Sequence, residues 1–474
     1  MTSAKPSVRT EKDSLGPMEV PADAYYGAST ARAIENFPIS KERFPRAFIR
    51  ALGLIKAAAA EVNAELGLLD RRRADAIVAA AGEVAAGALD AHFPLDIYQT
   101  GSGTSTNMNA NEVIANRADE LLGGARGSRT VHPNDHVNLC QSSNDVIPTA
   151  LHLAALLVIA EDLRPALVEL EAELRAKARA WWGIVKTGRT HLMDATPVRL
   201  GQEFGGYADQ VTATLRRLTY AEQELGEVAL GGTAVGSGIN AHPEFAARVC
   251  ATLSARTGVR VWETSAHFQA QACLDAVTFA SGVLRTYATS LHKIANDIRW
   301  MGSGPRAGLA ELLLPAVQPG SSIMPGKVNP VIAESVIQAC AQVVGNDLVV
   351  TLGNQGGNFE LNTMMPVMAL NLLNSLSLLA AVSRNFARQC VRGLEATARG
   401  PASVEQGLML ATALAPAIGY DAAAEIAKEA AKTGQSIREV ALARGVLPAE
   451  RLAELLDPES MTEPGVRGIP GGGL

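Results

Sequence analysis

Residues 145–182 read DVIPTALHLAALLVIAEDLRPALVELEAELRAKARAWW, and this stretch decides the fold class. Its apolar residues recur every three or four positions, which is the spacing of an α-helix. Four further segments have the same pattern and a comparable length: 201–230, 266–301, 329–352 and 361–392. Helices this long exceed the usual globular length, so the sequence predicts a mainly α protein with a central bundle of five long helices.

Shorter elements flank this bundle. Periodic, Ala-rich segments predict helices at 46–66 and 71–89, and a third helix is expected at 111–122. Gly, Pro, Ser and Asn mark loops at 92–107 and 129–143. Because faces of the long helices stay apolar, further helices must cover them, and we expect the chain to form an oligomer.

Composition and charge exclude several classes of protein. The chain has 474 residues, of which 47% are hydrophobic and 19% charged, so it is not a disordered chain. Its 42 Lys and Arg against 48 Asp and Glu give a net charge of -6, which offers no general attraction to nucleic acid or to anionic membranes. An anionic ligand would therefore need a local positive pocket.

The cysteines and the N-terminus indicate a cytoplasmic protein. Five cysteines lie far apart without a Cys-x-x-Cys pair, which predicts reduced thiols and no zinc or iron-sulfur centre. Residues 1–17 are polar and lack the apolar core of a secretory signal. The longest apolar run, at 150–160, is shorter than the roughly 18 to 20 residues of a membrane span, so we expect a buried helix face there.

The most unusual loop is 320–330, which reads GSSIMPGKVNP between two long helices. It is not a P-loop, because five residues separate Gly320 from the Gly-Lys pair and Val328 follows the lysine. Its residue types suit a small carboxylate: Lys327 supplies charge, Asn329 a donor, and loop N–H groups could stabilise an oxyanion on Ser321. An ordinary helix connection with Ser322 as a cap explains the same residues equally well.

A second loop, 186–197, also joins two long helices and contains His191 beside Thr190 and an arginine. This polar setting makes His191 the best candidate for handling a proton, whereas His152 on the apolar run is better explained as a core histidine. Glu334 follows Asn329 by five residues and could point back to orient a histidine.

Two further segments are dense in neutral donors. They are 100–107 and the pair 132–135 and 141–144. Each alone is better explained as a capping turn. Four such loops in one chain of long helices nevertheless favour a shared ligand site over four independent caps.

These segments together resemble the fumarase and aspartase superfamily, and within it the class II, iron-independent fumarases. The resemblance covers nearly the whole chain and includes 320–330, Gly188-Arg189-Thr190-His191, 231–236 and 357–362. It implies three domains at 1–140, 141–396 and 397–474, and a homotetramer around a twenty-helix core. Each active site would take loops from three subunits and need no metal or other cofactor.

The resemblance also implies a reaction and roles for single residues. The reaction is trans addition of water to fumarate, giving L-malate through an aci-carboxylate. Ser321 would be the base, and His191 with Glu334 would handle the departing hydroxyl. The implied substrate-binding residues are Ser102, Gly103, Thr104, Ser142, Ser143, Asn144, Thr190, Ser322, Lys327 and Asn329. An accessory anion site would comprise Arg129, His132, Pro133, Asn134 and Asp135.

Two alternatives stay open at this point. Ser105 and Thr106 depart from the common fumarase residues, and 105–112 is similar to aspartase, which keeps L-aspartate ammonia-lyase as the second candidate. The third is an inert structural protein on the same scaffold. Ser321, Lys327, Asn329 and His191 together argue against inertness.

Overall fold

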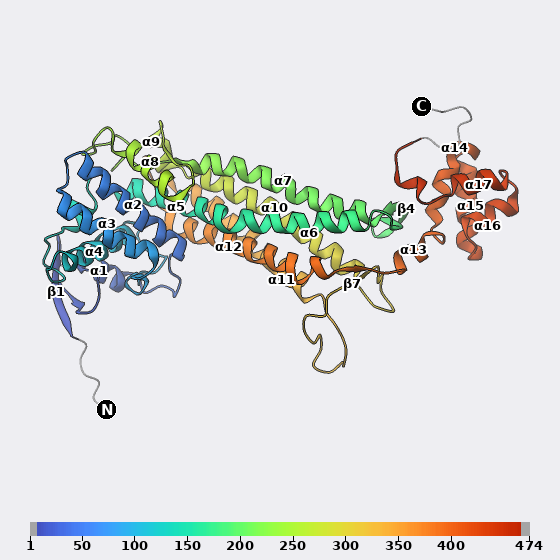
Figure 1. Ribbon diagram of the computed structural model, residues 1–474, viewed down its shortest axis with the longest axis horizontal. Helices are drawn as coiled ribbons and strands as arrows, with labels where there is room; N and C mark the ends of the chain where they lie inside the picture. The colour runs from blue at the N-terminus through green and yellow to red at the C-terminus, as the bar shows by residue number, and fades with distance from the viewer. Residues whose placement is uncertain (1–6, 466–474) are drawn as a thin grey trace. The chain divides into compact units, whose positions relative to one another are not determined.

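The computed structural model describes residues 7–465, and α-helices make up most of this part of the chain (Figure 1). The chain divides into two compact units. Unit 1 comprises Met1–Pro165, Thr214–Thr289 and Ala339–Ala381, and unit 2 comprises Ala166–Ala213, Ser290–Gln338 and Val382–Leu474. The boundaries 1–140, 141–396 and 397–474 of three domains remain a prediction. Part of the N-terminal segment used to predict the compartment, residues 1–6, lies outside the described residues.

The predicted long helices are confirmed. They are the continuous run of α5 (Ser143–Val158), the π-turn η3 (Ile159–Leu163) and α6 (Arg164–Ala180), followed by α7 (Leu200–Gly226), α10 (Asp275–Met301), α11 (Val331–Asn354) and α12 (Met365–Gln389). The π-turn comes just before Pro165, which has no N–H for the helical ladder. Each run contributes residues to both units.

Two boundaries of the long helices were predicted wrongly. The segment 266–301 forms two helices, α9 (His267–Ala272) and α10, because Cys273 is extended and the N–H of Leu274 donates to Oδ1 of Asn354 at 2.7 Å. Leu361 belongs to a short hairpin of β8 (Gly357–Asn358) and β9 (Leu361–Asn362) rather than to α12.

The remaining elements are short. In unit 1 they are β1 (Val8–Asp13), β2 (Gly16–Pro21), α1 (Ala28–Asn36), α2 (Arg46–Glu65), α3 (Arg71–Ala86), η1 (Asp90–His92), α4 (Thr104–Leu121), η2 (Pro133–Val137), β5 (Glu227–Val228), α8 (Phe245–Thr257) and β6 (Trp262–Glu263). In unit 2 they are β3 (Val185–Thr190), β4 (Met193–Arg199), β7 (Leu312–Leu313), η4 (Val391–Gly393), β10 (Glu395–Ala396), α13 (Arg399–Val404), η5 (Leu408–Leu414), α14 (Ala415–Ile418), α15 (Tyr420–Thr433), α16 (Ile437–Arg444), α17 (Ala449–Leu455) and η6 (Ser460–Thr462). Within residues 7–465 every sheet has two strands.

Two predicted loops are partly regular structure. Helix α4 begins at Thr104 rather than at 111, because Gly103 caps it with a φ of 72° and the side chain of Gln99 accepts hydrogen bonds from Thr106. The 186–197 loop is the antiparallel hairpin of β3 and β4, in which Arg189 faces Asp194 and Thr190 faces Met193.

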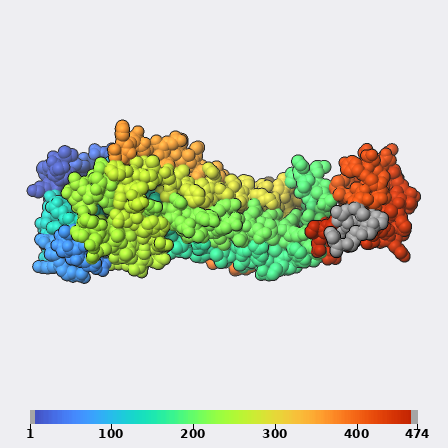
Figure 2. Space-filling model, turned by 90° about the horizontal axis from the view of Figure 1, so that it is seen from above, coloured from blue at the N-terminus to red at the C-terminus, as the bar shows by residue number. Residues whose placement is uncertain are grey.

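Polar contacts fix neighbours in the helical bundle. In unit 2 the hydroxyl of Tyr207 on α7 donates to Asp297 on α10 at 2.9 Å, and Arg388 on α12 binds both oxygens of Glu169 on α6. In unit 1 Ser281 on α10 donates to Asp347 on α11 at 2.8 Å, and Asn346 on α11 donates to Ser375 on α12. Helix α7 also forms part of the molecular surface, drawn in green in Figure 2.

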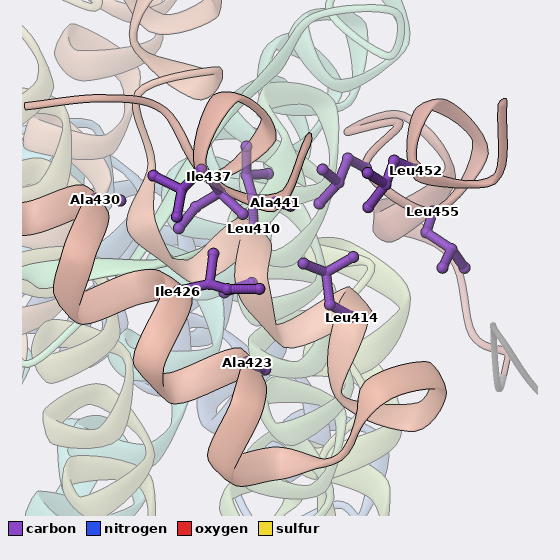
Figure 3. Close-up of a cluster of buried hydrophobic side chains, with 12 residues drawn as sticks. Leu410, Leu414, Ala423, Ile426, Ala430, Ile437, Ala441, Leu452 and Leu455 are labelled. Carbon is purple, nitrogen blue, oxygen red and sulfur yellow. The ribbon is translucent and has the colours of Figure 1, made fainter. Parts of the chain in front are cut away.

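The C-terminal helices enclose a small apolar core of their own (Figure 3). Leu410 and Leu414 from η5 pack with Ile426 from α15, Ile437 from α16 and Leu452 from α17. Gly434 and Gly445 end α15 and α16 with positive φ values, so these helices turn sharply enough to pack on one another.

Three of the described helices are both long and strongly apolar. By length and composition alone, Ser143–Ala180, Val331–Asn354 and Met365–Gly393 could each cross a membrane, so the length of the run at 150–160 does not exclude a span. Residues 150–159 are buried, which confirms the predicted buried helix face there. The first helix is 83% buried over its apolar window, as a helix inside a bundle would be. The second is only 39% buried, which leaves apolar surface on α11.

His152 is a core histidine, as predicted. Its Nδ1 lies 3.1 Å from the carbonyl oxygen of Leu225 and 2.9 Å from that of Glu227, so Nδ1 carries the proton and donates. Burial lowers the pKa of His152 to about 4, while the backbone contacts oppose this shift.

We expect His152 to make folding stability depend on pH. Between the unfolded pKa of 6.5 and the folded value of about 4, the unfolded chain binds more protons, so stability falls as the pH falls through this window. At pH 4 the free energy of unfolding is lower by about 3 kcal/mol on this account. Urea midpoints from pH 7 to 4 for wild type and His152→Gln measure it, since glutamine can still donate but does not titrate. Identical slopes for the two proteins would contradict this assignment.

Candidate active site

The start of α4 carries three of the predicted substrate-binding residues. Oγ1 of Thr104 lies 2.6 Å from Oγ of Ser102 and 2.7 Å from Oγ of Ser143, so hydroxyls from two helix starts form one chain of hydrogen bonds. Gly103 sits between Ser102 and Thr104, and a Cβ on it would lie 2.9 Å from Ile147. The structure therefore brings Ser102, Gly103, Thr104 and Ser143 together.

A capping box orients the start of α5. The N–H of Ser142 donates to Oδ1 of Asp145 at 2.9 Å, while Oγ of Ser142 accepts from the N–H of Asn144. The side-chain amide of Asn144 donates to the carbonyl of Ala234 at 2.8 Å. Because the cap fixes this turn, Ser142, Ser143 and Asn144 are held at the positive end of the helix.

Some of these residues line one open pocket of about 640 Å³ in unit 1. Thr104, Ser142 and Ser143 lie on its wall together with Asn134 and Asp135 of the predicted accessory anion site. In unit 1 the two predicted sites thus share a single cavity.

The rest of the accessory site is built around His132. Its Nδ1 accepts from the N–H groups of Asn134 at 3.3 Å and Asp135 at 3.2 Å, and Pro133 begins the π-turn η2. Arg129 does not line the pocket: its guanidinium donates to the carbonyl of Lys12, and its own N–H donates to Asp119. The structure brings four of the five predicted residues together and leaves Arg129 beside β1.

Three buried residues of charged type in unit 1 were not predicted from the sequence. Asp145 is fully buried, and burial raises the pKa of its carboxyl although three N–H groups donate to it. Glu112 is similar, because it accepts from the N–H groups at the start of α1. Lys56 on α2 is buried as well. The sequence did contain a signal for Lys56, because a single lysine stands there inside an Ala-rich, apolar helix.

The tip of the hairpin in unit 2 carries His191. His191 and Leu192 have φ values of 56° and 61°, a left-handed two-residue turn that non-glycine residues adopt at a cost. Thr190 and His191 are both exposed there. Below the tip, Glu311 accepts ion pairs from Lys186 and from Arg189, each at 2.8 Å, which anchors β3.

The 320–330 loop shows how Ser321 is held. Oγ of Ser321 accepts from the N–H of Ile323 at 3.2 Å and of Met324 at 3.0 Å. The ends of the loop close on each other, since Gly320 N–H donates to the Lys327 carbonyl and Asn329 donates to the Gly320 carbonyl. Ser322 and Lys327 are exposed. Figure 1 shows this loop between β7 and α11.

Unit 2 alone does not assemble the predicted catalytic residues. Ser321 lies in the loop, His191 at the hairpin tip and Glu334 in the first turn of α11. Among the described residues of unit 2, no hydrogen bond or ion pair joins any two of the three. Their roles, and those of the substrate-binding residues, stay predictions.

Comparisons with known proteins identify the family. A family model described as lyase matches residues 16–345, and one described as fumarase C C-terminus matches 410–463. A class II fumarate hydratase of Halobacterium salinarum is 58% identical over 97% of this chain and 98% of its own. The chain belongs to the class II fumarate hydratases. A Mycobacterium tuberculosis member is 53% identical, covering 95% of this chain and 94% of its own.

Solved structures of related proteins have the same fold. The class II fumarase of Schistosoma mansoni superposes with a TM-score of 0.93 at 40% identity, covering 96% of this chain and 99% of its own. A Brucella melitensis protein described as a fumarate lyase:delta crystallin reaches 0.92 at 47% identity, covering 97% and 100%. These matches confirm the predicted mainly helical fold of the superfamily.

The geometry at Gly103 predicts a specific effect on this hydratase. Gly103→Ala should lower stability by about 1 to 2 kcal/mol because of its positive φ. It should also raise KM for fumarate, because a methyl group against Ile147 shifts Thr104. Gly123→Ala is the matched control: its φ is 86° but no atom lies within 4 Å of the added Cβ. Thermal unfolding and steady-state kinetics test both. Equal effects on KM would contradict the crowding argument.

Proposed function

We propose that this hydratase adds water reversibly to fumarate, giving L-malate, with Ser321 as the base that removes the proton from carbon 3 of malate. A serine hydroxyl is far too basic to ionise near neutral pH without help. The observation that carries the proposal is the pair of N–H groups, from Ile323 and Met324, that donate to Oγ of Ser321. They would stabilise the anion as an oxyanion hole does.

The other predicted residues take complementary roles in this proposal. Lys327 and Asn329 hold the carboxylate on which negative charge accumulates as the aci-carboxylate forms. His191, oriented by Glu334, binds and protonates the departing hydroxyl through water. The remaining polar groups position the substrate: Ser102, Gly103, Thr104, Ser142, Ser143, Asn144, Thr190 and Ser322.

We further propose a homotetramer in which three subunits supply each active site. Support comes from α11, whose residues Val344, Leu348 and Leu352 are 41%, 60% and 54% exposed. Such an apolar face on a long helix favours burial against copies of itself. The separate positions of Ser321, His191 and Glu334 in unit 2 fit a site completed by neighbouring chains.

The sequence also supports work in the cytoplasm without a metal or cofactor. No disulfide joins any of the five cysteines, all of which lie within the described residues. The compartment itself stays a proposal.

We expect purified protein to consume fumarate in plain buffer. The absorbance of fumarate should fall as malate forms, without ammonium and in the presence of a chelator. The same assay with ammonium distinguishes the second candidate, L-aspartate ammonia-lyase. Turnover only with ammonium or aspartate, or its loss on chelation, would refute the proposal, and complete inactivity would favour the inert structural protein.

A composite site predicts complementation between inactive variants. Ser321→Ala and His191→Asn should each lower kcat by several orders of magnitude while the fold is kept, because both residues are in exposed turns. Unfolding the two tetramers and refolding them together should restore activity, since some hybrid sites then contain both intact residues.

Two controls make this result decisive. Ser322→Ala tests the assignment within the loop, because its hydroxyl is adjacent but accepts neither of the Ser321 hydrogen bonds. Greater damage from Ser322→Ala than from Ser321→Ala would move the base by one residue. Hybrid tetramers proven by mass but as inactive as their parents would exclude a site shared between chains.

A further inference from the structure

Lys56 on α2 is a buried cation whose hydrogen bonds go to neutral groups. Its side chain is 0% exposed. Its Nζ lies 2.9 Å from Oδ1 of Asn138 and 2.9 Å from Oε1 of Gln141. Burying an ammonium group without an ion pair is costly, so a compensating interaction is expected near it.

The two amides connect Lys56 with the pocket of unit 1. Asn138 and Gln141 both line that pocket, so one layer of side chains separates Nζ from it. The amides are also held in place: Asn138 donates to the Gln141 carbonyl, and Gln141 donates to the carbonyls of Val137 and Leu139. This turn leads directly into Ser142 and Ser143.

The surroundings of Lys56 contain little other charge. Burial lowers the pKa of Lys56 to about 7, opposed by the negative charge of Asp145 on α5. From α4 the neighbouring amides of Asn107 and Asn111 also donate to Asn138. Charged groups on the other elements packed against α2 have partners other than Lys56. Glu112 binds the start of α1, Glu83 binds Arg117 and Asp135 binds His132, while His136 accepts from the His132 N–H. Arg248 and Arg256 bind Glu65 and Glu61 of α2 itself.

We propose that Lys56 is a positioning residue which holds the Asn138–Gln141 turn and supplies the positive charge that draws one carboxylate of the substrate into this pocket. The proposal rests on the proposed function, in which Thr104, Ser142, Ser143 and Asn144 bind the dicarboxylate. It explains how a pocket lined by neutral groups and the carboxylate of Asp135, in a chain of net charge -6, attracts a dianion.

The charge on Lys56 then links substrate binding to pH. A bound dianion favours the protonated amine, so affinity is highest below pH 7 and declines as the pH rises through the pKa of about 7. A unit charge about one side-chain layer away changes affinity about ten-fold. We expect KM for fumarate to rise about ten-fold from pH 6 to pH 9 on this account.

Three variants of the full-length enzyme separate charge from packing. Lys56→Met removes the charge, so KM should be about ten-fold higher at pH 6 and independent of pH, with kcat less affected. Lys56→Arg stays charged throughout, so KM should stay low up to pH 9. Asn63→Leu is the matched control, because Asn63 on the same helix donates to the Leu139 carbonyl in the same turn without carrying charge. It should keep the pH dependence of the wild type.

The outcome is read from KM against kcat, with circular dichroism to confirm folding. A Lys56→Met profile that keeps the wild-type pH dependence would overturn the proposal. If a variant does not fold, calorimetry of wild type with succinate at pH 8 decides: binding should take up a proton, and binding without proton uptake would overturn it. Wild-type inactivity towards fumarate would instead show that the proposed function has failed, since succinate binding tests Lys56 separately.

Discussion

Asp145 accepts hydrogen bonds from the N–H groups of Ser142, Gly231 and Thr233 while its side chain has no exposed surface. One carboxylate thus caps α5 and fastens the 231–233 segment to its start. Burying the Asp145 carboxylate without these N–H donors would cost free energy. If Asp145 were removed, the three N–H groups would lose their acceptor inside the protein. The position of Ser142, Ser143 and Asn144 in unit 1 therefore depends on this interaction.

The same principle recurs at other helix starts in unit 1. Glu112 accepts the N–H groups that begin α1, and Gly103 opens α4 directly before Thr104. Helix starts leave N–H groups unpaired and carry partial positive charge, so α4 and α5 both present their positive ends to the pocket that Thr104 and Ser142 line. Lys56 adds a full charge to these partial ones.

The sequence predicted the long helices well because a periodic apolar face is a property of each segment by itself. The sequence-based prediction failed at helix boundaries that are fixed by a residue distant in the sequence. Asn354 binds the Leu274 N–H where the predicted 266–301 helix divides into α9 and α10, and Gln99 supports the earlier start of α4. The residues of the candidate site were predicted from the types of residue that occur in four loops. Lys56 was missed because the amides that make its burial tolerable come from a turn about 80 residues away.

The proposed site residues at helix starts and those in exposed turns are held in position by different interactions. Thr104 and Ser143 are fixed within one chain by buried caps, whereas Ser321 and His191 are in exposed turns stabilised by local hydrogen bonds and a strained backbone. An exposed turn contributes little to the core, so packing does not restrict its residues and they can be catalytic ones. In a tetramer, burying the apolar face of α11 would supply the free energy that such turns do not provide. Assembly and completion of the site would then be one event, and a separate subunit would be both less stable and inactive.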